Sequence, residues 1–427
     1  MIEPNAATRR LLLDLFATAV DSAHPRLCLP AHLPAPPKGR LVILAAGKAG
    51  ASMAAVAAAH YRALGAPVEG LAVCRHGYGE AALGLEVVEA GHPVPDQAGI
   101  EATERALALA AGARDDDLDL VPLTAAGSAN WLAPAPGLSL ADKQGLTRAL
   151  LRSGADIGEI NTVRKHLSRI KGGRLAAAAA PARILTLAIS DVPHDDPSVI
   201  ASGPTVPDPT TLADARAVLA RRGIVPEPAI AALLADPASE SPKPGDPAFA
   251  RAEYRIVAKP ADTIAAVCEA VRAAGYEPIS LGADLEGEAR DVAKAHAREA
   301  KALKVAGRRA ALVSGGELTV TIRGKGGRGG PNQEYALALA MALGGEEGIS
   351  ALAGDTDGTD GGGGDASDPA GALVDPTTLV RASAHSLDAA AFLDANDSTT
   401  FFETIGDLVT PGPTRTNVND CRIVLVD

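Results

Sequence analysis

Residues 40–64 read "RLVILAAGKAGASMAAVAAAHYRAL", and this stretch decides the fold class. An apolar run ends at Gly47, Lys48 and two further small residues, and an alanine-rich stretch of helical length follows. This order predicts a strand, a tight turn and a helix, the first part of a βαβ unit. The turn places a lysine and backbone N–H groups beside a positive helix end, which suits an anion. Taken alone, a plain glycine turn with a solvated lysine explains it better, because neither GxxxxGK[ST] nor GxGxxG is present.

The alternation of strand-like and helix-like runs continues along the chain. "EGLAVCRHG", "LEVVEAGHP" and "ARILTLAISDV" follow as strands, with alanine-rich helices between them, and together they predict a parallel sheet. Residues 236–250, "DPASESPKPGDPAFA", are typical of a linker or of a long surface connection. Beyond them, the alternating "ELTVTIR" at 317–323 predicts a half-exposed strand and therefore a mixed sheet. At roughly 150 residues per domain we expect two domains, at 1–240 and 251–427.

Composition excludes several classes of protein. The net charge of -12 disfavours a general nucleic-acid partner, so any anion site must be a local basic cluster. No segment approaches the roughly 20 uncharged apolar residues needed to cross a bilayer, and the N-terminus is unlike a signal peptide. The four cysteines are scattered without a CxxC pair, which favours a reducing compartment over a disulfide frame or zinc site. We expect a cytoplasmic protein.

Two segments gather basic residues. The run "INTVRKHLSRIKGGRLA" at 160–176 indicates either an anionic substrate or an ordinary basic surface helix, and it contains Arg164, Lys165, His166, Arg169, Lys171 and Arg174. The segment "SGGELTVTIRGKGGRGGPNQEYALALA" at 314–340 places Arg323, Lys325 and Arg328 among glycines, just before Asn332 in a predicted first helical turn. Glycines let backbone N–H groups approach phosphate oxygens, and an arginine can bridge two of them, so this segment predicts a phosphate site.

Acidic turns supply candidate metal ligands. "SDVPHDDPSVIASGPTVPDP" at 190–209 begins at the carboxyl end of a predicted buried strand, where open α/β sheets bind ligands. Asp191, Asp195 and Asp196 could hold a hydrated Mg²⁺, although Asp and Pro in a turn need no function. "GDTDGTDGGGGD" at 354–365 offers Asp357, and "TPGPTRTNVND" at 410–420 offers Thr414 and Asn417; both stretches could also be plain turns.

Taken together, these motifs resemble one family. "AAGKAG", "EAGHPVPDQAG", "INTVRKHLSRIKGGRLA", "SDVPHDDPSVIASGPTVPD", "SGGELTVTIRGKGGRGGPNQEYALA" and "GPTRTNVND" stand in the order of the glycerate 2-kinases with a C-terminal MOFRL domain, sometimes labelled hydroxypyruvate reductases. The resemblance implies an α/β fold: a Rossmann-like doubly wound parallel-sheet domain, a smaller mixed α/β MOFRL domain, and an active site in the cleft between them.

The resemblance also implies an activity. It is ATP- and Mg²⁺-dependent transfer of the γ-phosphoryl group to the 2-hydroxyl of D-glycerate, or of a related hydroxy acid, to give 2-phosphoglycerate. With the motifs above, the resemblance implies three catalytic residues, Lys48, Arg328 and Asp191, and three metal ligands, Asp191, Asp195 and Asp357. The residues expected to bind the acceptor are Ser128, Asn130, Arg164, Lys165 and His166. The residues expected to bind the nucleotide or its phosphates are Gly47, Gly315, Gly316, Glu317, Lys325, Asn332, Thr414 and Asn417. The motifs are compatible with a monomer and with a homodimer.

One stretch departs from the family. "LTAAGSANWLAPAPG" at 123–137 stands where members usually show Ser-Gly-Gly-Gly-Ser-Ala-Leu-Leu, and it follows a strand that contains Pro122. We hypothesise that Asn130 and Trp131 reshape the acceptor pocket; alternatively, Trp131 packs between the domains. Two other functions stay open, a hydroxypyruvate reductase and a non-catalytic anion-binding relative. The reductase should show GxGxxG and an acidic residue roughly 20 positions later, and neither is convincing here.

Overall fold

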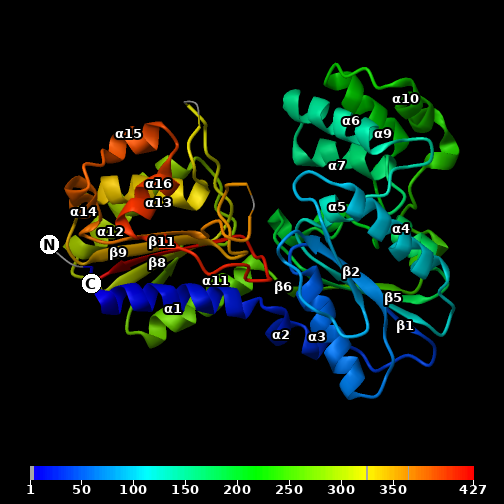
Figure 1. The fold of residues 1–427 in the computed structure, drawn as a ribbon, viewed down its shortest axis with the longest axis horizontal. Coiled ribbons are helices and arrows are strands. Elements are labelled where there is room, and N and C mark those ends of the chain that lie inside the picture. The colour runs from blue at the N-terminus through cyan, green and yellow to red at the C-terminus, as the bar shows by residue number, and fades with distance from the viewer. Residues whose placement is uncertain (1–3, 324–325, 364) are drawn as a thin grey trace. The chain divides into compact units, whose positions relative to one another are not determined.

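The computed structural model describes residues 4–323, 326–363 and 365–427, which form two compact units (Figure 1). Residues 29–257 form one unit, which we call the parallel-sheet unit. Residues 258–427 together with the first 28 residues form the other, the mixed-sheet unit. Each unit is built on one six-stranded sheet.

The parallel-sheet unit has the strand order β3-β2-β1-β4-β5-β6. Strands β1 to β5 pair in parallel, and β1 and β4 are buried along their whole length. The strands are β1 Leu41–Ala46, β2 Glu69–Arg75, β3 Glu86–Ala90, β4 Leu118–Leu123, β5 Arg183–Ile189 and β6 Ala252–Ala258. The helices are α3 Gly50–Ala63, α4 Gln97–Ala111, α5 Gly127–Asn130, α6 Leu140–Arg152, α7 Ile157–His166, α8 Arg174–Ala179, α9 Leu212–Arg221 and α10 Pro228–Ala235, with 3₁₀ turns at Pro30–His32, Pro193–Asp195, Ile200–Ser202, Pro237–Ser239 and Pro247–Phe249.

This order is that of a Rossmann-type doubly wound sheet, in which the direction of winding changes between β1 and β4. One face of β1, with Val42 and Leu44, packs in the same core as Ala102 and Ala106 of α4. Pro122 lies within β4, opposite Leu187 of β5, so this central strand tolerates a residue that has no N–H to donate.

The mixed-sheet unit has the strand order β11-β10-β9-β12-β8-β7. Only β7 and β8 pair in parallel among the ladders described in this sheet. The strands are β7 Glu277–Ser280, β8 Ala310–Ser314, β9 Ile349–Asp355, β10 Gly371–Val374, β11 Leu408–Val409 and β12 Asp420–Val426. The helices are α1 Ala6–Ser22, α2 Pro25–Cys28, α11 Pro260–Ala273, α12 Ala289–Val305, α13 Pro331–Leu343, α14 Thr378–Ala384, α15 Ala389–Asp394 and α16 Ser398–Ile405. The predicted fold class, a parallel α/β sheet with a second mixed α/β sheet, is confirmed.

The N-terminal helix corrects the predicted domain ranges. Helix α1 belongs to the mixed-sheet unit rather than to the domain predicted at 1–240. Its Leu12 and Phe16 share a core with Val267 of α11 and Ile423 of β12, while α12 and α13 cover the opposite face of the sheet (Figure 1). Burying the apolar stripe of α1 on this sheet stabilises the arrangement, although more than 200 residues of chain intervene.

Two further sequence predictions are decided by the structure. Of the two alternatives for residues 236–250, a surface connection within the parallel-sheet unit is found rather than a linker, and the guanidinium of Arg174 fixes it by donating to the carbonyls of Ser239 (2.7 Å) and Glu240 (3.2 Å). The predicted strand at 317–323 is absent from the described chain. Its Thr319 forms only an isolated bridge with Glu288, because this segment bonds to a loop rather than to a neighbouring strand.

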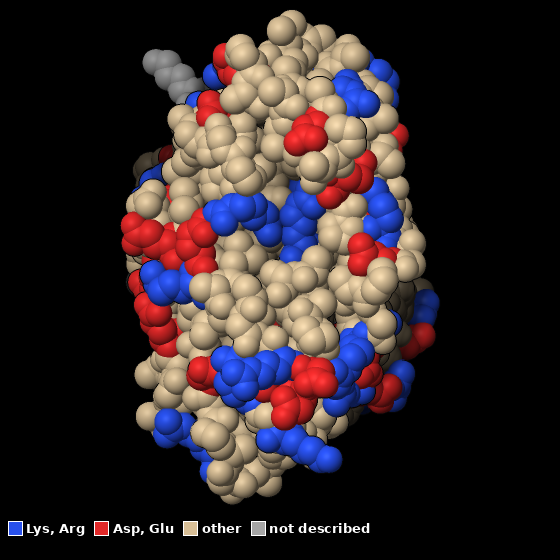
Figure 2. Space-filling model, turned by 90° about the vertical axis from the view of Figure 1, so that its right-hand side faces the viewer, with Lys and Arg blue, Asp and Glu red and all other residues tan. Residues whose placement is uncertain are grey.

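Acidic and basic side chains are interspersed over the face drawn in Figure 2, and the basic ones form small groups. None of the helices in the described segments combines the length and apolar character needed to cross a bilayer.

Candidate active site

Two turns meet at the carboxyl edge of the parallel sheet, where β1 and β4 are neighbours. The N–H of Lys48 donates to the carbonyl of Ala125 (2.8 Å), and the N–H of Ala49 donates to the hydroxyl of Thr124 (3.3 Å). Gly47 has φ +114°, and a Cβ there would lie 2.4 Å from the carbonyl oxygen of Ala125. Glycine is therefore required for the two turns to approach this closely. Lys48 is half-buried at the position where doubly wound sheets bind their ligands.

The turn after β4 holds an alanine in a strained conformation. Ala126 has φ +67°, in the left-handed region that L-residues other than glycine rarely adopt, and it precedes the short helix α5. The residue where the family usually carries glycine thus adopts a conformation that glycine adopts without strain.

We expect Ala126→Gly to raise the free energy of unfolding by about 1 kcal/mol, because glycine relieves the strain at positive φ. Urea unfolding followed by circular dichroism measures this change. Ala125→Gly is the matched control, since the φ of Ala125 is not positive, and it should destabilise by about 0.5–1 kcal/mol through the gain of chain entropy in the unfolded state. Equal effects of the two substitutions would contradict the assignment of strain.

Trp131 and Asn130 are core residues of this unit. Trp131 is 1% exposed and packs in the core that includes Ala133 and Ile170. Asn130 is fully buried, and its amide nitrogen lies 3.4 Å from the carbonyls of Ala90 and Gly91. The alternative that placed Trp131 between the domains is therefore wrong, and both residues shape the site through the backbone that they support.

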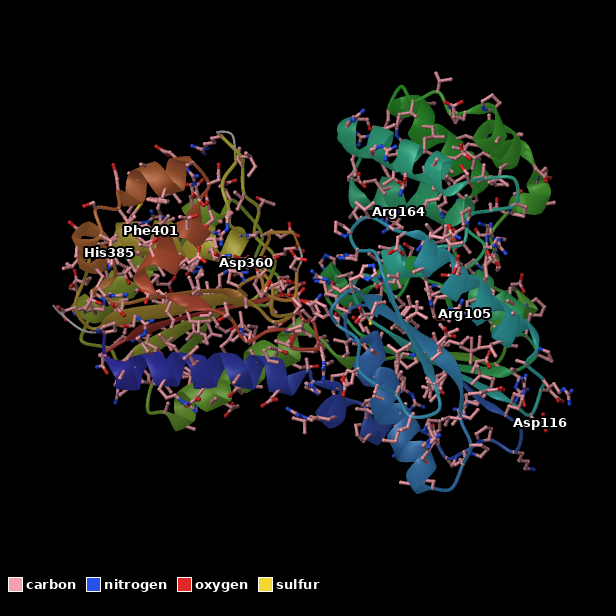
Figure 3. All side chains as sticks on the ribbon, in the orientation of Figure 1. Arg105, Asp116, Arg164, Asp360, His385 and Phe401 are labelled. Atoms are coloured by element: carbon pink, nitrogen blue, oxygen red, sulfur yellow. The ribbon has the colours of Figure 1, made fainter. Side chains whose placement is uncertain are left out.

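A pocket of about 490 Å³ lies beside the α5 turn. Ser128, predicted at the acceptor site, lines it, whereas its described neighbours Asn130 and Trp131 do not. Further walls come from residues 92–95 after β3, from one face of α6, and from Arg164 on α7, which is labelled in Figure 3. Helix α6 begins with a capping box between Ser139 and Asp142.

The floor of this pocket is cationic. Lys143 is 5% exposed, and its Nζ has no hydrogen-bond partner among the described residues. Burial, together with the nearby charge of Arg164, lowers the pKa of Lys143 to about 7. Lys171 donates to the carbonyls of Ser128 (2.6 Å) and Trp131 (3.1 Å), and burial with its cationic neighbours lowers its pKa well below the ordinary lysine value.

Sequence reasoning missed Lys143, although a signal was present. Lys143 stands three and seven positions before Leu146 and Leu150, which are buried in a core cluster. A lysine on the apolar stripe of an amphipathic helix is costly unless it serves a purpose, so it marks a candidate binding residue.

The other two basic residues predicted at the acceptor are held in a buried network. Lys165 lies 3.4 Å from a carboxylate oxygen of Asp208. His166 lies 2.9 Å from Glu240 through Nε2 and 2.8 Å from the carbonyl of Thr162 through Nδ1. These contacts connect α7 to the 208–241 region, so in this structure only Arg164 of the three lines the pocket.

The predicted metal ligands after β5 are at the same edge of the parallel sheet. Asp191 follows β5 after one residue, and Asp195 is half-buried in the next turn, where His194 also has positive φ. Asp191 and Asp196 lie near the half-buried Tyr254, whose pKa is raised mainly by desolvation of its hydroxyl and also by these two carboxylates. Throughout the described ranges, no group of three or more His, Cys, Asp or Glu side chains could hold a metal by itself.

In the mixed-sheet unit, several predicted residues meet at one end of the sheet. Pairing of Asp355 with Asp420, and of Ser314 with Arg422, places the loops after β8 and β9 beside the loop before β12. This edge carries Gly315, Gly316, Glu317, Asp357, Thr414 and Asn417. It is already rich in internal contacts: Arg422 donates to the carbonyls of Gly315 and Gly316, and Thr359 donates its N–H to Asp357.

The carboxylate of Asp360, a residue labelled in Figure 3, lies at the N-terminus of α13. The backbone N–H groups of Asn332 and Gln333 donate to its carboxylate at 2.9 and 2.8 Å. Burial raises the pKa of Asp360 to about 7, although these donors oppose the change. The helix end predicted to face a phosphate therefore binds a carboxylate of this chain instead.

The glycine segment also carries two predicted phosphate-binding cations, Lys325 and Arg328. Lys325 lies outside the described residues. Arg328 is exposed, and its guanidinium pairs with Glu403 at 2.9 Å.

A Rossmann-type sheet with a lysine turn at its switch point and a pocket lined by basic residues beside it, joined in one chain to a mixed sheet, defines a two-domain α/β protein with a candidate anion site. Family models match a "domain of unknown function (DUF4147)" at residues 11–235 and the MOFRL family at residues 310–420. A D-glycerate 2-kinase of Thermotoga maritima is 36% identical over 100% of both chains. A protein of Agrobacterium vitis with the provisional name hydroxypyruvate reductase is 47% identical over 99% of this chain and 95% of its own.

The solved structures agree with the sequence comparisons. The crystal structure of a glycerate kinase from Thermotoga maritima matches with a TM-score of 0.88 at 36% identity, over 99% of this chain and 100% of that one. The chain therefore belongs to the family of glycerate 2-kinases with a MOFRL domain, and the resemblance inferred from the sequence motifs is confirmed.

Proposed function

We propose that this protein is a kinase that transfers the γ-phosphoryl group of ATP to the 2-hydroxyl of D-glycerate, giving 2-phosphoglycerate. The observation that carries the proposal is the 36% identity to a D-glycerate 2-kinase across the whole length of both chains. The lysine-bearing turn at the switch point of the parallel sheet supports it, because phosphoryl transfer depends mainly on charge neutralisation and in-line positioning.

Lys48 and Arg328 are the proposed charge stabilisers. Lys48 extends from a turn whose backbone is fixed by Ala125 and Thr124, so the point from which its side chain extends is set before substrate binds. Arg328 carries a long exposed side chain whose present partner, Glu403, is also exposed, so phosphate oxygens can replace that carboxylate at small cost.

We propose that the carboxylates after β5 hold a magnesium ion delivered with ATP. Mg²⁺ is usually held by one or two protein carboxylates together with phosphate oxygens and water, and Asp191 and Asp195 provide that number. Bound there, the ion would neutralise charge on the transferring phosphoryl group. Asp357, the third predicted ligand, belongs to the mixed-sheet unit and accepts from the N–H and hydroxyl of Thr359 through one oxygen.

One assay tests this proposal against the reductase name of some relatives. Purified protein is incubated with ATP, Mg²⁺ and D-glycerate, and ADP release is followed. A parallel reaction follows NADH consumption with hydroxypyruvate. We expect ADP and 2-phosphoglycerate to form and NADH to stay constant, because the β1 turn has two glycines and a lysine in place of the dinucleotide pattern GxGxxG. NADH consumption without ADP release would refute the kinase.

A further inference from the structure

The cationic pocket of the parallel-sheet unit lacks a counter-charge of its own. Among the described residues that line it, Lys143, Arg148, Arg164 and Lys171 are basic and none is acidic. Lys143 and Lys171 are almost completely buried, so bulk water does not solvate either ammonium group. Buried charges in proteins are normally paired, because an unpaired one carries a large desolvation cost. A bound anion would remove both this cost and the repulsion between the cations.

The lining favours a compact anion over a triphosphate. Triphosphates are usually held by backbone N–H groups of glycine-rich turns, and no glycine is found among the described lining residues. The donors here are instead side chains at the base of a pocket whose rim includes the exposed apolar residues Val94 and Leu151. Apolar walls lower the local dielectric and strengthen an ion pair made at the base.

The pocket also lies beside the proposed catalytic lysine. Ala126, which lines the pocket, directly follows Ala125, whose carbonyl accepts the N–H of Lys48. A small acid anchored at the base of the pocket would therefore lie close to the Lys48 turn.

We infer that this pocket binds the carboxylate of the hydroxy-acid acceptor, with Lys143 and Arg164 as its direct ligands and Lys171 as a positioning residue that holds the Ser128 turn. The inference rests on the proposed function for the identity of the acceptor. Of the three basic anchors predicted from sequence it keeps Arg164, and it puts Lys143 in place of Lys165 and His166.

A matched pair of ligands tests the inference without catalysis. D-Lactate and propane-1,2-diol differ only in that the first carries a carboxylate where the second carries a hydroxymethyl group. Calorimetric titration of the full-length protein at pH 6.5 should detect binding of D-lactate and none of the diol. Lys143→Met should weaken D-lactate binding at least tenfold, while the exposed control Lys38→Met leaves it unchanged. Equal binding of lactate by wild type and Lys143→Met would overturn the inference.

The pH dependence gives a second readout for Lys143. Its neighbours from the surrounding elements are Arg148 on the same helix, Arg164 on α7, Lys171 after α7 and His92 after β3. Because the pKa of Lys143 lies near 7 in the empty pocket and an anion would raise it, lactate affinity should fall by up to tenfold per pH unit above pH 7. Lys143→Met should lose this dependence. A wild-type affinity that is constant from pH 6.5 to 8.5 would count against Lys143 as a ligand.

Steady-state kinetics separate this inference from the proposed function. Lys143→Met and Arg164→Met should each raise KM for D-glycerate at least tenfold and leave KM for ATP within twofold. Arg164 is only half-buried, so Arg164→Met still tests the pocket if Lys143→Met does not fold. A selective rise in KM for ATP would overturn the inference and leave the kinase intact. Lactate binding that depends on Lys143, in a protein that releases no ADP, would uphold the pocket and refute the kinase.

Discussion

Lys48→Ala is expected to lower kcat for D-glycerate phosphorylation by about 10²–10³-fold, because it removes one fixed positive charge from the site where phosphoryl charge develops. The loss should fall mainly on kcat, since the lysine is proposed to act on the transferring group rather than on the acceptor. The backbone contacts of the turn do not depend on the side chain, so the melting temperature should change little. Coupled measurement of ADP release gives kcat and KM for both substrates.

Lys38→Ala is the matched control for Lys48. Lys38 lies ten positions earlier in the same unit and is exposed, so its removal makes the same chemical change away from the sheet edge. We expect near-wild-type kinetics for Lys38→Ala. A Lys48→Ala enzyme that keeps more than half of wild-type kcat would remove Lys48 from the mechanism.

Asp119→Asn is expected to raise the free energy of unfolding, relative to wild type, by up to about 4 kcal/mol more at pH 8 than at pH 4. This difference follows from the shifted pKa of the Asp119 carboxyl group. Asp119 lies within the central strand β4 and is fully buried, and its two oxygens have no hydrogen-bond partner in the described chain. Burial, with the nearby charge of Asp117, raises its pKa from 3.8 to about 7. Arg40, the nearby cation, donates to Asp117 instead (3.1 Å).

The free energy of unfolding falls with pH wherever the native state binds the Asp119 proton and the unfolded state does not. Between pH 4 and 7 the native protein keeps the proton on Asp119 while the unfolded chain releases it, so wild-type stability falls as pH rises. Above about pH 7 both states are ionised, and the loss is complete. Asparagine cannot ionise, so the variant should gain up to about 4 kcal/mol relative to wild type between pH 4 and pH 8.

Urea unfolding at pH 4.5, 6 and 8 measures this relative gain and cancels the titration of other groups. Asp116→Asn, at an exposed position labelled in Figure 3, is the control and should give curves parallel to wild type. A constant difference between Asp119→Asn and wild type across this range would show that Asp119 is already ionised at pH 4.5.

The sequence by itself determined the local architecture of the parallel sheet. The apolar runs of β1, β2 and β5 are recognisable because a strand covered on both faces is continuously apolar. The Gly47 turn was recognisable because a strand that ends in glycine before an alanine-rich helix has few other local solutions. These properties depend on neighbours within a few positions, so they can be read from the order of residues.

The tertiary structure decided which charged residues are available to a ligand. Lys165 and Lys171 belong to one basic run, yet Lys165 is paired with Asp208, while Lys171 lies at the base of the pocket among other cations. Their different surroundings come from residues more than 25 positions away, on segments that the fold brings alongside. Lys143 lies outside that run, and only the packing of α6 places it beside Arg164.

Long-range contacts also decide where the N-terminal helix packs and why residues 317–323 do not form a strand. The stripe of α1 predicts an amphipathic helix, but its choice of sheet depends on apolar surface supplied by residues beyond 258. The alternation at 317–323 is typical of a strand, but a strand also needs a neighbour with free backbone groups, and here the contacts come from the loop at 287–288. Local periodicity is encoded in the sequence order, whereas the partners that bury, pair or neutralise a side chain come from long-range contacts.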